Sequence, residues 1–403
     1  MTWLAYAGFY LTRKAFSVAK VELKKPEVLG LTTGQMSWMD SAYSLAYALG
    51  QFFWGTLGDR AGTRAVILLG MAGSVAVALL MGWSGTVTAL TVLLALQGWF
   101  QSSGWAPLAK NLGEFFSRRE RRGVMGFWCT NYAFGGFIAS AVAGYAAQWF
   151  GWRWAFFVPA GALAVIWLIF FLLQRNRPED AGLPSIETFH DEAVAASRTS
   201  RQAFGEVLRN RMVWLLAGVY MLIKPTRYLI LFWAPVFVNA RLGTGTAASG
   251  VLGSMFDLAG PLGTLAGGVI SDRLFASKRM PASILALFLL AACMIAFPHL
   301  PASRAAVGCG LFLIGFLVYI PDSLVSGTAA IDFGGKRGAS TASGLVNGFG
   351  SLGQIVGVSM PGWIGAFLAH GADIWSPIFT CLGIALAAAG VILLPQWNRV
   401  PAR

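Results

Sequence analysis

The chain has 403 residues, of which 56% are apolar and only 12% are charged, and its mean hydropathy is +0.64. A soluble domain has roughly 25% charged residues, so this chain has too little polar material to cover a soluble fold of its size. The net charge of +13 lies in short clusters between apolar segments, which argues against a nucleic-acid-binding surface. The composition therefore excludes a soluble protein and indicates a polytopic membrane protein.

Apolar segments recur along the whole chain at about the 20-residue length that crosses a bilayer. They predict an all-α integral membrane protein of twelve transmembrane helices, with one long polar stretch after the sixth. The chain then divides into a six-helix half at 1–174, a cytoplasmic linker at 175–209 and a second six-helix half at 210–403. In chain order, helices are predicted over residues 1–20, 35–57, 64–83, 86–111, 123–149, 152–174, 210–240, 246–271, 281–299, 303–331, 338–369 and 373–396.

The first apolar run begins at Met1, so no cleavable signal peptide is expected, and a native N-terminal extension remains an open question. Four cysteines lie inside apolar segments and are expected to be small buried hydrophobes rather than a disulfide or metal set. They are Cys129, Cys293, Cys309 and Cys381.

Lys and Arg residues collect in one set of loops, which includes the linker and a predicted loop with Lys336 and Arg337. That set holds 19 of them, whereas the opposite loops hold six: Lys20, Lys24, Lys25, Arg153, Arg241 and Arg304. Positive residues prefer cytoplasmic loops. We therefore expect a multi-pass protein of a bacterial inner membrane with both termini in the cytoplasm.

The two halves repeat one another at offsets of 213 to 215 residues. Two parallel six-helix repeats around a site near mid-bilayer are a known transporter architecture. The matching landmarks are Asp59 with Asp272, Arg13 with Arg227, Pro107 with Pro321, and Arg122 with Arg337.

A Gly-x-x-x-Asp-Arg-x-Gly-x-Arg string resembles the cytoplasmic signature of the major facilitator superfamily. Its glycines allow close helix packing, and its Asp is suited to pair with Arg or to cap a neighbouring helix. We expect a structural and gating role for its residues and for those of a weaker second copy. They are Gly55, Asp59, Arg60 and Arg64, with Asp272 and Arg273 in the copy.

Arg13 lies about 12 residues into the first helix, roughly 18 Å along its axis, where an arginine costs at least ~2.5–3.5 kcal/mol. One interpretation is a structural ion pair with Asp40, Asp257 or Asp322. The equivalent position of Arg227 favours another, in which both face a central cavity. A planar guanidinium binds phosphate through two hydrogen bonds, so this pair predicts an anion site.

Other charges inside the helices have two interpretations each. Lys14 points away from Arg13 and is expected to form an internal ion pair, for example with Asp257. Lys224 lies one turn before Arg227 and adds positive charge to the same face. Asp40 and Asp322 either neutralise these cations or carry a proton, and pairing is the favoured role.

Other chemistries are not supported by the sequence. The three histidines, His190, His299 and His370, form no metal-ligand spacing, and Gly334-Gly-Lys-Arg does not complete a nucleotide-binding loop. Trp105 and Pro107 interrupt the fourth helix, as a kink or as a cavity wall. No enzyme activity, metal or cofactor is expected.

The chain resembles the organophosphate:phosphate antiporter family over nearly its whole length. That family includes bacterial glycerol-phosphate and hexose-phosphate antiporters and eukaryotic sugar-phosphate exchangers. The strings that carry the resemblance are Tyr10-Leu-Thr-Arg-Lys-Ala-Phe-Ser, Gly98-Trp-Phe-Gln-Ser-Ser-Gly-Trp-Ala-Pro, Arg121-Arg-Gly-Val-Met-Gly-Phe-Trp and Arg227-Tyr-Leu-Ile-Leu-Phe-Trp-Ala-Pro.

The resemblance implies that Arg13 and Arg227 are the phosphate ligands and that Lys224 is an auxiliary charge. A Lys of the bacterial members is replaced by Gln51, and a His of the glycerol-phosphate type by Tyr132. These departures favour a sugar phosphate or a similar small phosphoester over glycerol 3-phosphate. Weaker candidates for contacts to the organic part are Gln51, Tyr43, Tyr132, Asn131 and Trp105.

The resemblance thus predicts a secondary transporter that exchanges an organic phosphate for inorganic phosphate by alternating access, in a monomer without nucleic acid. One alternative is a proton-coupled symporter of an organic carboxylate, with Asp40 or Asp322 as proton carrier. Another is a transporter-like membrane sensor of a phosphoester.

Overall fold

The computed structural model describes residues 1–117, 120, 124–125, 127–184, 186, 207–369 and 371–399, without the side chains of residues 59, 328, 330–332 and 334–341. Within these ranges the secondary structure is helical, and no strand occurs. The α-helices are α1 (Thr2–Leu23), α2 (Thr33–Ala61), α3 (Thr63–Trp83), α4 (Val87–Gln101), α5 (Trp105–Glu114), α7 (Asn131–Phe150), α8 (Trp154–Leu173), α11 (Arg211–Leu242), α12 (Thr246–Gly253), α13 (Met255–Val269), α14 (Arg279–Ala296), α15 (Arg304–Ser323), α16 (Ala330–Phe367) and α17 (Trp375–Leu393). Short 3-10 or π segments are η1 (Pro178–Ala181), η2 (Ile270–Leu274), η3 (Phe297–His299), η4 (Leu324–Ala329) and η5 (Leu394–Gln396).

The α-helices account for twelve spans, because α4 with α5 and α12 with α13 each form one broken span. Six of the described helical segments are long and apolar enough to cross a membrane by length and composition alone. Several of the others carry internal charge; α1, for example, holds Arg13, Lys14 and Lys20. The all-helical, twelve-span prediction is confirmed.

Each of the two broken spans is interrupted at a defined place in the sequence. The predicted interruption of the fourth span is found, since α4 ends at Gln101 and α5 begins at Trp105. Pro107 lies in the first turn of α5, where its missing N–H has no intrahelical partner to lose. The eighth span was predicted as one helix, but it breaks at Ser254, the C-cap of α12.

Two assignments to loops are wrong. Lys20 lies inside α1, is completely buried and forms an ion pair with Asp40 of α2. The charge is compensated inside the protein, so the helix continues to Leu23. Lys336 and Arg337 lie in the helical backbone of α16, which follows the π segment η4 without an intervening loop.

The cysteines also differ from the prediction. All four are free thiols, but Cys309 and Cys381 are exposed and Cys129 and Cys293 are half-buried. The two exposed thiols lie on α15 and α17, which are long and apolar enough to cross a membrane.

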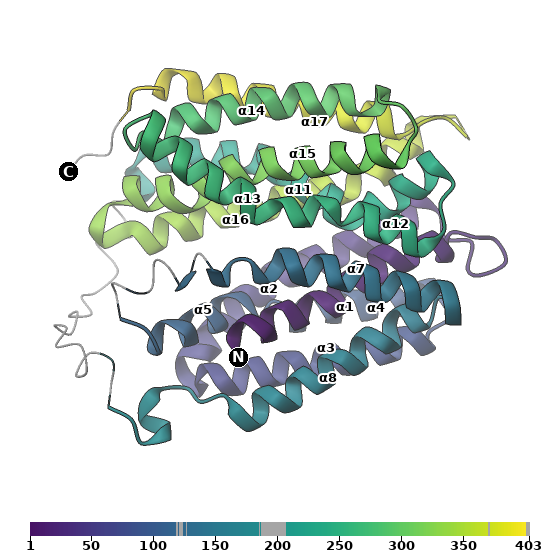
Figure 1. Cartoon of the computed structure of the whole chain (residues 1–403), viewed down its shortest axis with the longest axis horizontal. Coiled ribbons are helices and arrows are strands. Elements are labelled where there is room, and N and C mark those ends of the chain that lie inside the picture. The colour runs from purple at the N-terminus through teal and green to yellow at the C-terminus, as the bar shows by residue number, and fades with distance from the viewer. Residues whose placement is uncertain are drawn as a thin grey trace. The chain divides into compact units, whose positions relative to one another are not determined.

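The described chain forms two compact units. The first comprises residues 1–197 with 243–254, and the second comprises residues 198–242 with 255–403. In the first, α1 packs on α7, α2 on α4, and α3 on α8 (Figure 1). In the second, α11 packs on α16, α13 on α15, and α14 on α17. In each unit the first span therefore pairs with the fifth, the second with the fourth and the third with the sixth, as an internal repeat requires.

The helix α12 belongs to the first unit although it follows α11 in sequence. It packs closely on α7, because a Cβ atom on Gly144 would lie 2.9 Å from the Cα of Ala247, and one on Gly250 would lie 2.9 Å from the carbonyl oxygen of Ser140. Thr246 also donates a hydrogen bond to Glu22 of α1. The predicted division into 1–174 and 210–403 stays a prediction.

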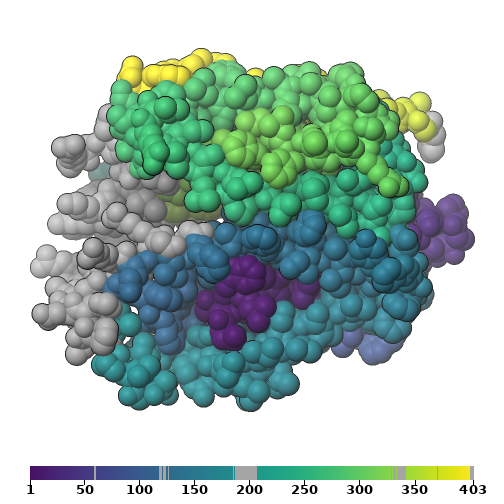
Figure 2. Space-filling model, in the orientation of Figure 1, coloured from purple at the N-terminus to yellow at the C-terminus, as the bar shows by residue number. Residues whose placement is uncertain are grey.

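Buried residues of the first unit gather around α1. Nearly all of α1 is buried, and only Trp3, Leu4 and Glu22 are half-buried. Figure 2 shows a purple patch of residues near the N-terminus on the face in view. A helix that is buried on all sides has no lipid-facing stripe, so its charged residues lie against other protein groups.

Candidate functional site

In the first unit, Arg13 is held by neutral partners. Its side chain is 5% exposed. Its Nε donates to Oε1 of Gln101, the last residue of α4, at 2.9 Å, and the Tyr43 hydroxyl donates to the same oxygen at 2.8 Å. The Gln101 amide in turn donates to the Thr12 hydroxyl at 2.9 Å. These bonds fix the direction of the guanidinium group without cancelling its charge.

Aromatic rings complete the surroundings of Arg13. Its guanidinium carbon lies 4.6 Å from the ring centroid of Tyr10 and 5.0 Å from that of Tyr47. The Nη2 atom is buried and has no hydrogen-bond partner among the described residues. Asp40, the carboxylate of the first unit that was proposed as a partner of Arg13, pairs with Lys20 instead. Arg13 therefore presents a desolvated donor and an uncompensated charge, which is the arrangement that an anion requires.

In the second unit, Arg227 and Lys224 of α11 share one carboxylate. The Nη1 atom of Arg227 lies 2.8 Å from Oδ2 of Asp322, and the Nζ atom of Lys224 lies 3.7 Å from Oδ1. The Tyr220 hydroxyl donates to the same Oδ1 at 3.0 Å. Asp322 thus lies within ion-pair distance of both cations, and its role stays a prediction. Two cations against one carboxylate leave a single net positive charge.

Tyrosines surround this group as well. The guanidinium carbon of Arg227 lies 4.5 Å from the ring centroid of Tyr319, and the Nζ atom of Lys224 lies 4.8 Å from that of Tyr220 and 5.2 Å from that of Tyr228. The face of an aromatic ring attracts a cation. Arg13 and Arg227 thus both lie against tyrosine rings. They differ in that Arg227 forms an ion pair with Asp322, whereas no described carboxylate pairs with Arg13.

The structure brings only some predicted site residues together with Arg13. Tyr43 joins it through Gln101. Trp105 instead lies in a ring cluster with Tyr6 and Trp128, at centroid distances of 5.3 and 5.1 Å.

The remaining predicted contact residues lie on α2 and at the start of α7. Gln51 is exposed on α2. Asn131 and Tyr132 are buried at the start of α7, and both polar atoms of the Asn131 amide are buried without a hydrogen-bond partner among the described residues. Lys14 is buried in the first unit and Asp257 in the second, and their pairing stays a prediction.

Sequence reasoning missed Gln101 and most of the tyrosines. A signal existed for the rings. Tyr43 and Tyr47 are four residues apart on α2, as are Tyr220 and Lys224 on α11, and residues at that spacing share one helix face. Gln101 carried no such signal, because its partner lies in another helix, 88 residues away.

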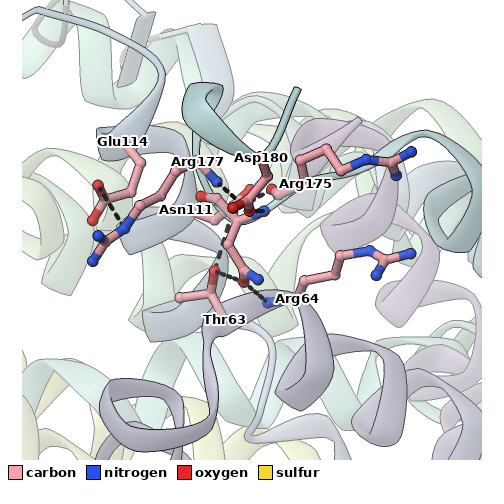
Figure 3. Close-up of polar contacts among 8 residues, drawn as sticks. Thr63, Arg64, Asn111, Glu114, Arg175, Arg177 and Asp180 are labelled. Carbon is pink, nitrogen blue, oxygen red and sulfur yellow. Dashed lines mark hydrogen bonds and ion pairs between the residues drawn. The ribbon is translucent and has the colours of Figure 1, made fainter. Parts of the chain in front are cut away.

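The superfamily signature lies at the α2–α3 turn, beside the beginning of the linker (Figure 3). The Asn176 side chain accepts hydrogen bonds from the backbone N–H of Arg64 at 2.8 Å and from the Thr63 hydroxyl at 3.3 Å. Asn111 of α5 donates to the Thr63 hydroxyl at 3.1 Å. Gly55 and Arg60 belong to α2, and the side chain of Asp59 lies outside the described residues.

The second copy of the signature contains an ion pair. Asp272 lies 2.6 Å from Nη1 of Arg279, the first residue of α14, and accepts a hydrogen bond from Ser277 at 2.9 Å. The hydrogen bonds from Ser277 and Arg279 lower the pKa of Asp272. Arg273 is exposed. In the part of the chain that the structure describes, no cluster of three or more potential metal ligands occurs.

Comparison with known proteins decides the family. The sequence pattern of the Major Facilitator Superfamily matches residues 2–358. The chain belongs to this superfamily. Within the superfamily its curated relatives are of the organophosphate:phosphate antiporter type. The glycerol-3-phosphate transporter of Bacillus subtilis (strain 168) is 30% identical, over 98% of this chain and 90% of that protein.

Other relatives and structures agree with this family. The membrane sensor protein UhpC of Escherichia coli (strain K12) is also 30% identical, over 98% of this chain and 90% of that protein. A probable hexose phosphate transport protein of Chlamydia trachomatis is 28% identical, over 98% of this chain and 89% of that protein.

Among solved structures, the nucleoside transporter NupG superposes with a TM-score of 0.74 at 10% identity, covering 98% of both chains. An inward-facing, unoccupied bacterial homolog of the human lysosomal transporter Spinster superposes with a TM-score of 0.75 at 14% identity, covering 98% of this chain and 94% of that one. Both show the fold alone. The protein is therefore a multi-pass membrane protein of a family of transporters, not an enzyme.

Proposed function

We propose that this major facilitator protein exchanges a small phosphoester, such as a sugar phosphate, for inorganic phosphate. The observation that carries the proposal is the state of Arg13, a buried arginine with an unpartnered Nη2 donor and neutral hydrogen-bond partners among the described residues. A guanidinium in this state favours an anionic ligand with several acceptor oxygens, and phosphate supplies them. The names of the curated relatives support a phosphoester.

In this proposal Arg13 and Arg227 bind one phosphate group, one from each half. Four charged residues set the balance, namely Arg13, Arg227 and Lys224 against Asp322, and three positive charges less one negative charge leave +2. A dianionic phosphate neutralises that charge. Binding then requires Asp322 to give up donors of Arg227 or Lys224 to the ligand, so Asp322 acts as an internal substitute for phosphate in the empty protein.

The organic part of the ligand is proposed to lie against uncharged groups. Asn131 offers a buried amide without a hydrogen-bond partner among the described residues, which suits a sugar hydroxyl. Gln51, Tyr132, Tyr43 and Trp105 remain candidates for the same role.

Exchange by alternating access, a monomeric state and residence in a bacterial inner membrane with cytoplasmic termini are parts of the same proposal. The charge bias of the loops supports the orientation. Reassigning Lys20 to α1, and Lys336 and Arg337 to α16, leaves 17 positive residues in the cytoplasmic set and 5 in the opposite set, so the bias is kept. A reporter fused after Arg403 is expected to be active in the cytoplasm, and activity only in the periplasm would contradict the orientation.

The deciding experiment is counterflow in proteoliposomes that are loaded with inorganic phosphate. External labelled sugar phosphates and glycerol 3-phosphate are offered one at a time, with empty vesicles and vesicles without protein as controls. We expect uptake of at least one phosphoester that depends on internal phosphate. Uptake driven by an imposed pH gradient without internal phosphate would favour proton symport instead.

A sensor is the second candidate, because UhpC matches the chain as well as the glycerol-3-phosphate transporter does. Arg13 and Arg227 would then bind the phosphoester, but the protein would not carry it across the membrane. Saturable binding in detergent together with no flux in vesicles would favour the sensor.

A further inference from the structure

The two arginines Arg64 and Arg175 lie beside the last turn of α8, at one side of the network in Figure 3. Asn111 donates to the carbonyl oxygen of Arg175 at 3.0 Å, and Asn176 accepts from the backbone N–H of Arg64 at 2.8 Å. Gly62 permits this close approach, because it has a φ of +86° and a Cβ atom there would lie 3.1 Å from Oδ1 of Asn176. The backbones of both arginines are therefore fixed by the same pair of asparagines.

Their guanidinium groups are fixed as well. Arg64 donates from Nη2 to the carbonyl oxygen of Phe171, and its guanidinium carbon lies 5.4 Å from the Phe171 ring centroid. Arg175 donates from Nη1 to the carbonyl oxygens of Leu172 and Gln174 at 3.1 and 3.0 Å. Carbonyls in the last turn of a helix lack intrahelical partners and attract cations. Figure 3 shows both guanidinium groups extending to the same side of the network.

Neither arginine is neutralised by an acid among the described side chains. Asp180 accepts hydrogen bonds from the backbone N–H groups of Asn176 and Arg177, and Glu114 pairs with Arg177 at 3.8 Å. Within the described part of the chain, no carboxylate lies within ion-pair distance of Arg64 or Arg175. The Nε atom of Arg64 is buried and has no hydrogen-bond partner among these residues. Among the described side chains, both guanidinium groups therefore keep their positive charge.

The surface next to these arginines is apolar and exposed. The last three residues of α8, Phe171, Leu172 and Leu173, are 44%, 57% and 62% exposed. The helix is apolar enough to cross a membrane. Two cations at the end of an exposed apolar helix face match a molecule that has an anionic headgroup and hydrocarbon chains.

We propose that Arg64 and Arg175 form a binding site for the phosphate headgroup of an anionic phospholipid, whose acyl chains lie along the exposed face of α8. A soluble phosphate would offer the same oxygens, but it would leave the adjoining apolar surface unused. This lipid site does not include Arg13 or the residues bonded to it, and the proposal does not depend on which substrate is transported.

The site is tested by native mass spectrometry of the purified, delipidated protein in detergent, titrated with phosphatidylglycerol or phosphatidylcholine. The variants are R64Q, R175Q and the double variant. R153Q is the matched control, since Arg153 lies at the opposite end of α8 over the Trp152 ring. We expect phosphatidylglycerol affinity to fall about fivefold for each arginine removed and about 25-fold for both. R153Q and the affinity for phosphatidylcholine should change little.

Unchanged phosphatidylglycerol binding in the double variant, or an equal loss in R153Q, overturns the proposal. Displacement of the lipid by millimolar inorganic phosphate also overturns it, because the site would then serve a soluble anion. If the double variant does not fold, R175Q alone decides, since the Arg175 side chain bonds only carbonyls within three residues of it in the described chain. Unfolding temperature without added lipid identifies a folding defect.

Discussion

Replacing Asp322 with Asn removes the one carboxylate that Arg227 and Lys224 share. The structure gives N–O distances of 2.8 and 3.7 Å for these contacts, so at an effective dielectric constant of ~20 the attractions are about 6 and 4.5 kcal/mol before desolvation. Removing one partner of such a buried ion pair costs about 3–5 kcal/mol in practice. The empty D322N protein should therefore be less stable by that order.

Phosphate should recover part of this loss, because in the proposed mechanism it binds the donors that Asp322 has released. Recovery of only ~1.4 kcal/mol raises phosphate affinity about tenfold. Tighter binding at both membrane faces slows release, so exchange turnover should fall. The expected result is a less stable protein that binds phosphate at least about tenfold more tightly.

The measurement is thermal unfolding in detergent over a phosphate titration, together with calorimetric binding. Asp40→Asn is the matched control, because Asp40 is also a buried acid paired with a buried lysine, Lys20. It should destabilise the protein to a similar degree and leave phosphate affinity unchanged. If D322N binds phosphate no more tightly than the wild type, or if D40N shows the same gain, the assigned role of Asp322 is wrong.

Three further results are expected. Arg13→Lys and Arg227→Lys should each abolish exchange in proteoliposomes although the charge is kept, since an ammonium does not reproduce the guanidinium fork; normal exchange in either would remove that arginine from the site. Lys20→Met leaves Asp40 buried without its cation and should lower stability by about 3–5 kcal/mol, measured by unfolding in detergent, with no loss expected in Lys24→Met as the control. The pKa of Asp272 is lower in the folded protein than in the unfolded chain. The ion pair with Arg279 therefore stabilises the folded protein at pH values above the usual titration range of an aspartate. This contribution is lost as the pH falls through the pKa of the folded protein. Because the Asp272 carboxylate is exposed, Asp272→Asn should lower the free energy of unfolding by no more than about 1 kcal/mol near neutral pH. A difference in unfolding temperature between this variant and the wild type that persists below the folded pKa of Asp272 would contradict a stabilising ion pair with Arg279.

The sequence was sufficient for the fold because hydropathy depends on composition alone. The twelve spans followed from apolar length and spacing, and the repeated helix pairings agree with that count. The linker after the sixth span and the equivalence of Arg13 and Arg227 stay predictions. Two arginines at matching positions inside predicted helices were also the strongest signal for the site.

What the sequence did not provide are contacts between side chains of different helices. A lysine near a helix end reads as a loop residue unless its partner is known, and the partner of Lys20 is an aspartate in another helix. Gln101 reads as an ordinary polar residue before a break, yet it holds Arg13. No proline marks the break at Ser254 in the sequence. The sequence also does not show that α12 packs on α7 of the first unit, because this depends on close contacts of Gly144 with Ala247 and of Gly250 with Ser140.

The discontinuity between α12 and α13 bears on how one span is shared between the two units. The polypeptide leaves one unit and enters the other between Ser254 and Met255, in the middle of a membrane-crossing span. The break is one residue long, and the backbone N–H of Ser254 still donates to the carbonyl oxygen of Gly250 at 3.1 Å. The eighth span therefore contributes α12 to the packing of the first unit and α13 to that of the second, although a single residue separates the two helices.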